Sequence, residues 1–83
     1  MPIQLALFYR EHMMDYVVNT RGQLHYDQKN SASFPQFSEA LDYIIENYSE
    51  RKSGLVIDDY VREKKKSELE QKLKGTKVEV KNR

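Results

Sequence analysis

Cysteine is missing from this chain of 83 residues, which excludes disulfide bonds, thiolate metal sites and a cysteine nucleophile. Only three glycines are present, and their wide spacing excludes a P-loop and a glycine-rich dinucleotide turn. Hydrophobic runs are well below the roughly 20 residues of a membrane-spanning helix, so no membrane partner is expected. The amino-terminal segment lacks the basic region and the small-residue cleavage site of a signal peptide. We therefore expect a cytoplasmic protein.

The residues that are present predict one small domain. Hydrophobic residues make up 39% of the chain and charged residues 33%, which is polar for a globular domain but outside the disordered range. Six tyrosines and three phenylalanines are enough for a compact, thin core. Within this single domain we expect a hairpin-plus-helix core over residues 1–57 and a basic, charged segment over residues 58–83.

Charge is distributed unevenly between these two segments. Residues 1–61 hold five basic and nine acidic residues, a net charge of −4, whereas residues 62–83 hold nine basic and four acidic residues, a net charge of +5. An acidic body with a basic tail can fold the tail onto its own acidic surface, associate head to tail, or offer each end to a different partner.

Two segments in the first third of the chain have the alternation of β-strands. Residues 3–8 alternate in a way that suits a partly buried strand, although Pro2 at a first helical position leaves a short helix as the alternative. Residues 15–27 predict a hairpin around the turn at residues 19–22, in which Asn19 hydrogen-bonds the turn backbone and Gly22 supplies a positive φ. Residues 28–33 are polar and predict a connector.

An amphipathic helix is predicted from about Phe34 to Glu50. Ser33 and Gln36 fit a capping box at its start, and Gly54 is a plausible stop after its end. The apolar residues at helical spacing share one face, which should dock on the core; they are Phe37, Leu41, Ile44, Ile45 and Tyr48.

The last third of the chain predicts three further elements. Residues 55–57 form a short apolar strand, Asp58 caps a second helix over residues 59–74 that Gly75 closes, and residues 77–81 alternate like an edge strand. The predicted fold is therefore α+β: a small, mostly antiparallel sheet, one amphipathic helix packed across it, and a charged carboxyl-terminal helix with a short edge strand.

Four carboxylates line the side of the first helix opposite its apolar face. They follow one another at steps of three, four and four residues, which places them on one helical face; we call Glu39, Asp42, Glu46 and Glu50 the acidic stripe. Tyr43 lies close beside this stripe on the helical wheel. The stripe is either a solvated surface or a docking site for a basic partner or for the basic tail, and complementary charge would mainly accelerate and specify such association.

The basic segment offers an alternative site, for nucleic acid. Its lysines could contact phosphates while strand tyrosines such as Tyr9, Tyr16 and Tyr26 stack on bases; the candidates are Lys64, Lys65, Lys66, Lys72 and Lys74. Interspersed glutamates and a sequence pI near 7.9 fall short of the usual basic footprint. A helix laced with salt bridges is the simpler interpretation.

Catalytic patterns are not found. His12 and His25 are the only histidines, and with the acidic residues near them they lack the spacing of a specific metal site. Asp58 followed by Glu63 and Lys65 suggests a metal-dependent nuclease, but that chemistry needs adjoining strands rather than one or two helical turns. We expect no enzymatic activity, no cofactor, no metal and no small-molecule substrate.

The function that we predict is non-enzymatic protein binding through the acidic stripe. The hairpin, the polar connector and the helical run from Phe34 to Ile45 together look like many small uncharacterised bacterial and bacteriophage proteins. We expect an accessory or inhibitor protein of a phage or mobile element that binds a host protein. Nucleic-acid binding is the alternative. Self-association is a third possibility, because the second helix has too few apolar residues to cover itself.

Overall fold

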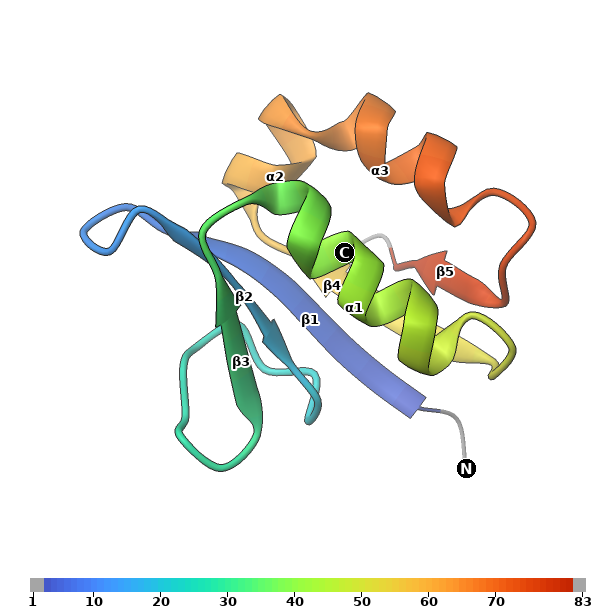
Figure 1. The fold of residues 1–83 in the computed structure, drawn as a ribbon, viewed down its shortest axis with the longest axis horizontal. Helices are drawn as coiled ribbons and strands as arrows, with labels where there is room; N and C mark the ends of the chain where they lie inside the picture. The colour runs from blue at the N-terminus through green and yellow to red at the C-terminus, as the bar shows by residue number, and fades with distance from the viewer. Residues whose placement is uncertain (1–2, 82–83) are drawn as a thin grey trace.

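The protein is a five-stranded sheet with three short helices (Figure 1). The structure is a computed structural model and describes residues 3–81. The strand order is β3-β2-β1-β4-β5. The elements in chain order are β1 (Ile3–Arg10), β2 (Asp15–Asn19), β3 (Ser31–Phe34), α1 (Phe37–Tyr48), β4 (Ser53–Ile57), α2 (Asp59–Lys64), α3 (Lys66–Leu73) and β5 (Val78–Val80). The predicted α+β class is confirmed, and residues 3–8 lie in a strand rather than in the alternative helix.

The sheet is mixed. Strand β1 pairs antiparallel with β2, which pairs antiparallel with β3, whereas β1 and β4, and β4 and β5, run parallel. Parallel neighbours need a crossover connection, and α1 between β3 and β4 and α2–α3 between β4 and β5 supply one each. Two of the four strand pairs are thus parallel, whereas we expected mostly antiparallel pairing.

The main core lies between the sheet and the helices. Leu5 and Leu7 on β1 are fully buried, as period-two alternation requires of one strand face. The predicted apolar face of α1 supplies the other side, with Phe37, Leu41 and Ile44 buried. Among residues 3–81, no helix is long and apolar enough to cross a membrane.

The opposite face of the sheet is also buried, under the segment of residues 20–30 that follows β2. Ala6 and Val17 are fully buried there, and Gly22 approaches so closely that a Cβ at its position would lie 2.9 Å from the Cβ of Gln4. Gly22 also has φ +76°, a backbone conformation that favours glycine. This segment therefore acts as a second, irregular layer.

The predicted hairpin over residues 15–27 is wrong. Strand β2 ends at Asn19, and its antiparallel partners are β1 before it and β3 after the segment of residues 20–30. Asn19 does bond the turn backbone as expected, since its Oδ1 accepts from Arg21 N at 2.8 Å and from Gln23 N at 3.2 Å. The turn starts a long loop instead of a second strand, and Ser31, predicted in a connector, starts β3.

Helix α1 is shorter than predicted at both ends. Gln36, not Ser33, is its N-cap, and the Gln36 N–H donates to the Glu39 carboxylate at 3.1 Å. Ser33 lies in β3, where β-sheet pairing with Val17 takes precedence over capping. The helix ends at Tyr48, and Gly54 is a buried residue of β4 rather than the stop signal.

The charged segment begins as predicted and then breaks. Asp58 is the N-cap of α2 and accepts from Val61 N at 2.9 Å. The helix is interrupted at Lys65, whose φ of −125° is not helical, so the predicted helix over residues 59–74 is two helices. The break lets both α2 and α3 bury apolar residues, because Val61 and Leu69 both reach the core. Gly75 follows α3 with φ +84°, as a helix stop requires.

Candidate functional site

The acidic stripe is exposed along its whole length. Glu39, Asp42, Glu46 and Glu50 are all exposed, while the apolar side of α1 is buried against the sheet. Glu39 has a structural role as well, because its carboxylate accepts the Gln36 N–H at the start of the helix. The predicted geometry of one buried and one acidic face is thus confirmed for Glu39, Asp42 and Glu46, whereas Glu50 is exposed but lies beyond the end of α1 at Tyr48.

The basic segment lies beside the acidic stripe and does not cover it. Helix α3 runs next to α1 on the same side of the sheet (Figure 1), and one of its lysines approaches the stripe. Lys72 Nζ lies 3.9 Å from Asp42 Oδ1, and both side chains remain about half exposed. Among the described side chains, this long contact is the only ion pair of the stripe. Tyr43 points to the other side of α1, where its ring packs 5.4 Å from that of Phe34.

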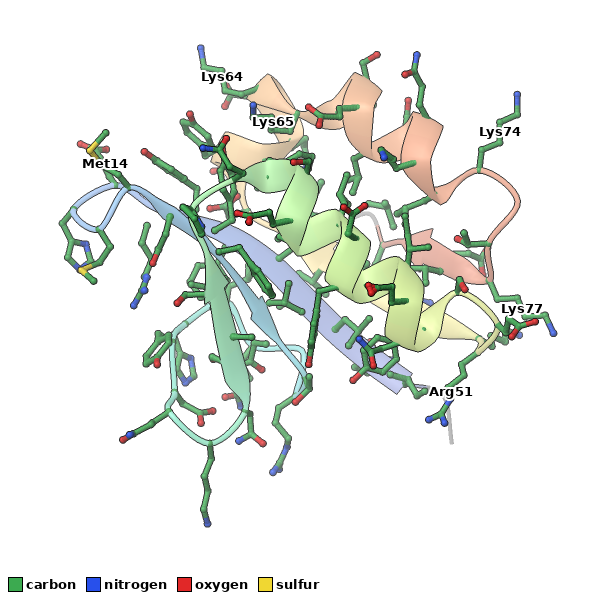
Figure 2. The ribbon with its side chains drawn as sticks, viewed as in Figure 1. Met14, Arg51, Lys64, Lys65, Lys74 and Lys77 are labelled. Atoms are coloured by element: carbon green, nitrogen blue, oxygen red, sulfur yellow. The ribbon has the colours of Figure 1, made fainter. Side chains whose placement is uncertain are left out.

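The candidate nucleic-acid lysines do not form one row. Lys64 and Lys74 point outward at opposite ends of the carboxyl-terminal helices, while Lys65 turns inward (Figure 2). Lys66 is exposed, and Lys72 is directed toward Asp42. Since phosphates along a backbone need a continuous basic track, these five side chains do not present one.

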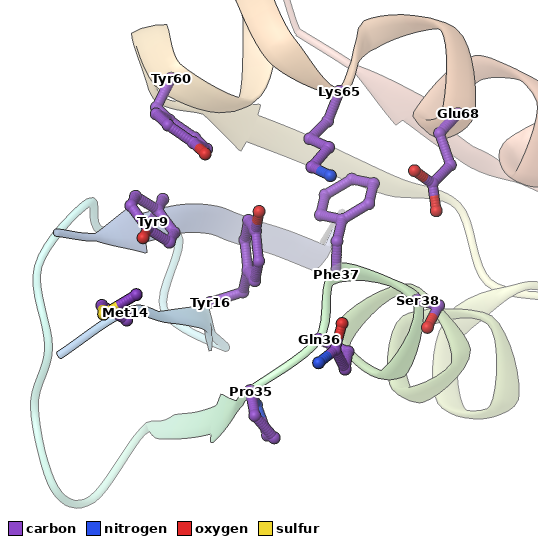
Figure 3. A pocket seen from close by; sticks show the side chains of 10 residues that line it. All are labelled: Tyr9, Met14, Tyr16, Pro35, Gln36, Phe37, Ser38, Tyr60, Lys65 and Glu68. Carbon is purple, nitrogen blue, oxygen red and sulfur yellow. The ribbon is translucent and has the colours of Figure 1, made fainter.

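Lys65 turns toward an aromatic pocket that the sequence did not predict. The pocket has a volume of about 240 Å³ and lies where β1, β2, α1 and α2 meet (Figure 3). Its walls include Tyr9, Tyr16, Phe37 and Tyr60, and we call it the aromatic pocket. Tyr9 and Tyr60 stack with ring centroids 4.1 Å apart, and Tyr16 meets Phe37 edge-on at 5.2 Å.

The aromatic pocket also contains polar and charged groups. Lys65 Nζ lies 5.6 Å from the ring centroid of Phe37 and 6.0 Å from that of Tyr16, within the range of a cation–π contact. Burial, followed by the effect of the neighbouring Tyr60, raises the pKa of Tyr16 to about 12. The side chains of Gln36 and Glu68 complete the rim (Figure 3). The pocket therefore combines aromatic walls with polar groups, among them one cation and one carboxylate.

Exposed methionines stand next to this pocket. The β1–β2 turn carries Met13 and Met14, whose exposed fractions are 54% and 73%, and Met14 lines the pocket. Tyr60 is also 39% exposed. Met14 has φ +54°, which makes it the one non-glycine residue with positive φ in the described part of the chain. Large exposed apolar side chains gathered at one end of a small protein are typical of an interaction surface.

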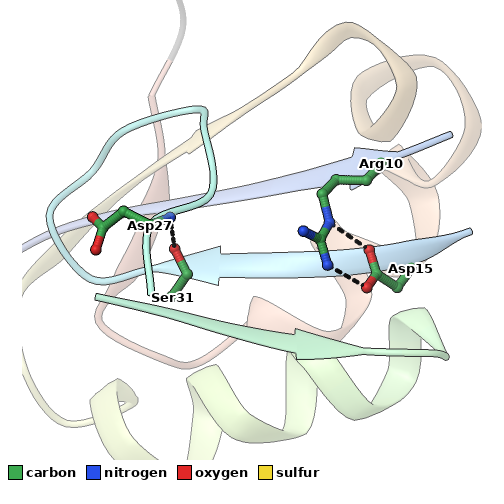
Figure 4. Close-up of polar contacts among 4 residues, drawn as sticks. All are labelled: Arg10, Asp15, Asp27 and Ser31. Carbon is green, nitrogen blue, oxygen red and sulfur yellow. Dashed lines mark hydrogen bonds and ion pairs between the residues drawn. The ribbon is translucent and has the colours of Figure 1, made fainter. Parts of the chain in front are cut away.

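The other candidate residues take structural positions. Tyr16 is buried, so the prediction that it is exposed for stacking on bases is wrong. Tyr26 lies in the loop of residues 20–30 rather than on a strand. Arg10 packs over the Tyr26 ring at 4.5 Å and forms a two-pronged ion pair with Asp15, at 2.8 and 2.6 Å (Figure 4). Between residues 3 and 81, no three histidine or acidic side chains gather as metal ligands would.

The loop of residues 20–30 is closed by Asp27. Its backbone N–H donates to Ser31 Oγ at 3.0 Å (Figure 4), and its carboxylate accepts from the side chain and the backbone of Asn30. These hydrogen bonds, with the Asn30 side chain first, hold the pKa of Asp27 below its ordinary value. Asp27 is therefore part of the fold and not a candidate ligand.

Comparison with known proteins gives no match: no family model, no curated protein sequence and no solved structure is similar to this chain. Its function is therefore argued from its own surfaces.

Proposed function

We propose that this protein is a non-enzymatic binding module that docks a basic surface of a partner protein on the acidic stripe. The observation that carries the proposal is the open stripe. The chain contains a segment with a net charge of +5, yet the described residues of that segment, up to residue 81, contribute a single ion pair of 3.9 Å to the stripe. The like charges one helical turn apart cost roughly 0.2–0.5 kcal/mol per pair, and a basic partner would offset that cost.

The aromatic pocket supports the same proposal, because its aromatic rings and Met14 can supply contacts that charge does not. The first turn of α1 contributes Phe37 and Ser38 to the pocket and Glu39 to the stripe, so the two features adjoin. In protein interfaces, complementary charge sets the association rate, whereas buried aromatic and methionine contacts supply most of the affinity. A partner with basic residues next to an apolar anchor would fit this surface.

Charge reversal with a matched control tests the proposal. Glu46→Lys reverses a charge in the middle of the stripe, and Glu63→Lys reverses a charge on α2 that is also exposed. Both variants have the same net charge. Proteins retained by the immobilised wild-type chain from a lysate of its source cells are compared with those retained by each variant.

The expected result is a protein retained by the wild-type chain and by Glu63→Lys but lost from Glu46→Lys. Its retention should also weaken as salt is raised, because the docking charges are exposed. Equal retention by all three chains would overturn the stripe as the docking site. Urea unfolding of each variant checks that the fold is unchanged.

A further inference from the structure

Strand β5 leaves one edge of the sheet open. Lys77 O and Lys81 N bond to β4, at 3.1 Å and 2.8 Å. Because successive residues of a strand turn their backbone groups to opposite sides, the N–H and C=O groups of Val78 and Val80 face away from β4. The Val78 N–H is bonded by Thr76 Oγ1 at 3.3 Å, so Val80 is the residue of this edge with both groups turned outward and no intrachain partner among the described residues.

Two hollows flank Val80 beneath α3. One, of about 280 Å³, has the apolar side chains of Ile57, Leu69 and Val80 in its lining, and the other, of about 350 Å³, those of Leu73, Val78 and Val80. Charged side chains make up the rest of both linings; they are Arg62, Lys66, Glu70, Lys74 and Glu79. The Val80 side chain itself is only partly buried against the core. An open edge beside hollows with apolar side chains at their base is a template for pairing with another strand.

The charged residues that alternate with the valines of β5 indicate which strand could pair with this edge. Lys77, Glu79 and Lys81 alternate with the two valines and are all exposed. In an antiparallel pair of two identical β5 strands centred on Val80, Glu79 of each copy lies directly opposite Lys81 of the other. Opposite charges at directly paired positions stabilise a sheet, whereas like charges destabilise it.

We infer that β5 is a dimerisation edge, on which a second copy of this chain adds its own β5 antiparallel across a twofold axis at Val80. The two Val80 residues exchange N–H···O=C bonds, and their side chains meet between the hollows under α3. Two Glu79–Lys81 pairs fix the register. The twofold arrangement makes the contact self-complementary and closed. The surface shares no residue with the acidic stripe or the aromatic pocket.

Sedimentation equilibrium of the full chain up to millimolar concentration tests the dimer, with a charge-swap series at the edge. Glu79→Lys and Lys81→Glu each place like charges opposite one another twice in the dimer, and each should raise the dissociation constant about tenfold. The double variant restores opposite charges and should return the dissociation constant to near the wild-type value. Lys29→Glu, an exposed lysine in the segment of residues 20–30 at the other end of the sheet, is the matched control and should leave the dimer intact.

A chain that remains monomeric at millimolar concentration would overturn the inference. The inference would also be overturned if the double variant dimerised no more tightly than the two single variants, because additive losses of affinity indicate that the two side chains do not pair. Loss of the dimer in Lys29→Glu would refute β5 as the dimer edge. Circular dichroism and urea midpoints of each variant show whether the monomer is folded, so that a folding defect is not counted as a lost contact.

Discussion

Asn19 is the polar side chain on which the irregular layer over the sheet depends most. It is fully buried and makes four hydrogen bonds. Its Oδ1 accepts from the backbone of Arg21 and Gln23, and its Nδ2 donates to His25 O at 3.3 Å and to Ser31 Oγ at 3.0 Å. One amide side chain therefore ties both ends of the 20–30 segment to β2.

The cost of removing this side chain follows from these bonds. Each hydrogen bond contributes about 0.5–1.5 kcal/mol net, and buried groups that lose their partner cost more. Arg21 and Gln23 are exposed, so water can replace part of what their N–H groups lose. We expect Asn19→Ala to lower the free energy of unfolding by about 2–4 kcal/mol, a large share of the roughly 4–12 kcal/mol of a domain of this size.

Urea unfolding followed by circular dichroism measures this loss. Thr20→Val is the control, because the Thr20 hydroxyl makes a single bond in the same segment, to Asn30 O at 3.2 Å, and its loss should cost about 1 kcal/mol. Proteolysis of Asn19→Ala should begin within residues 20–30. A loss below about 1 kcal/mol, or no larger than that of Thr20→Val, would refute the reasoning.

Four further predictions concern titration, backbone strain and nucleic acid. The pKa of Tyr16 in the folded protein is raised to about 12, so its contribution to stability is complete below the unfolded value of about 10 and is lost as pH rises through 12. In an alkaline titration followed by phenolate absorbance, Tyr16→Phe should lack the step at the highest pH. An unchanged titration would contradict this. The lowered pKa of Asp27 means that its contribution is present above the unfolded value and is lost as pH falls through the folded one, so Asp27→Asn should flatten the acid limb of stability. Met14→Gly should raise the free energy of unfolding by up to about 1 kcal/mol, since glycine adopts φ +54° without strain, and a destabilised variant would show that the Met14 side chain matters more. DNA and RNA should not be retained at low salt, because the lysines point in different directions; retention that weakens on neutralising Lys64–Lys66 would revive the nucleic-acid alternative.

Patterns that depend on neighbours in the sequence predicted the correct elements. Alternation over residues 3–8 indicated a strand, although residues 5–8 are buried on both of its faces. The apolar face of α1 indicated which side of that helix packs on the sheet. Asp58 was recognisable as an N-cap because capping needs only the following three residues. The acidic stripe belongs to the same class, as its exposure follows from the burial of the opposite face.

Strand pairing was predicted less well because it is decided by the whole chain. The turn chemistry of Asn19 and Gly22 is real, but a loop of residues 20–30 intervenes before β3, and such long connections are uncommon. The actual β1–β2 turn, from Glu11 to Met14, contains no glycine, asparagine or proline and places Met14 in a left-handed conformation instead. No local signal marks that turn.

The aromatic pocket was not predicted for a similar reason. Its rings come from β1, β2, α1 and α2, and they meet only once the sheet order and the break at Lys65 are known. The adjoining Met13–Met14 pair is the one sequence feature that points to this end, because neighbouring methionines in a turn have no core to occupy.

The most direct test of the proposed function is the affinity of a captured partner for Glu46→Lys relative to Glu63→Lys, two folded chains of equal net charge. If the acidic stripe is the docking site, Glu46→Lys binds about tenfold more weakly, mainly through a slower association rate, and Glu63→Lys binds like the wild-type chain. Equal affinities of the two variants would contradict the proposal.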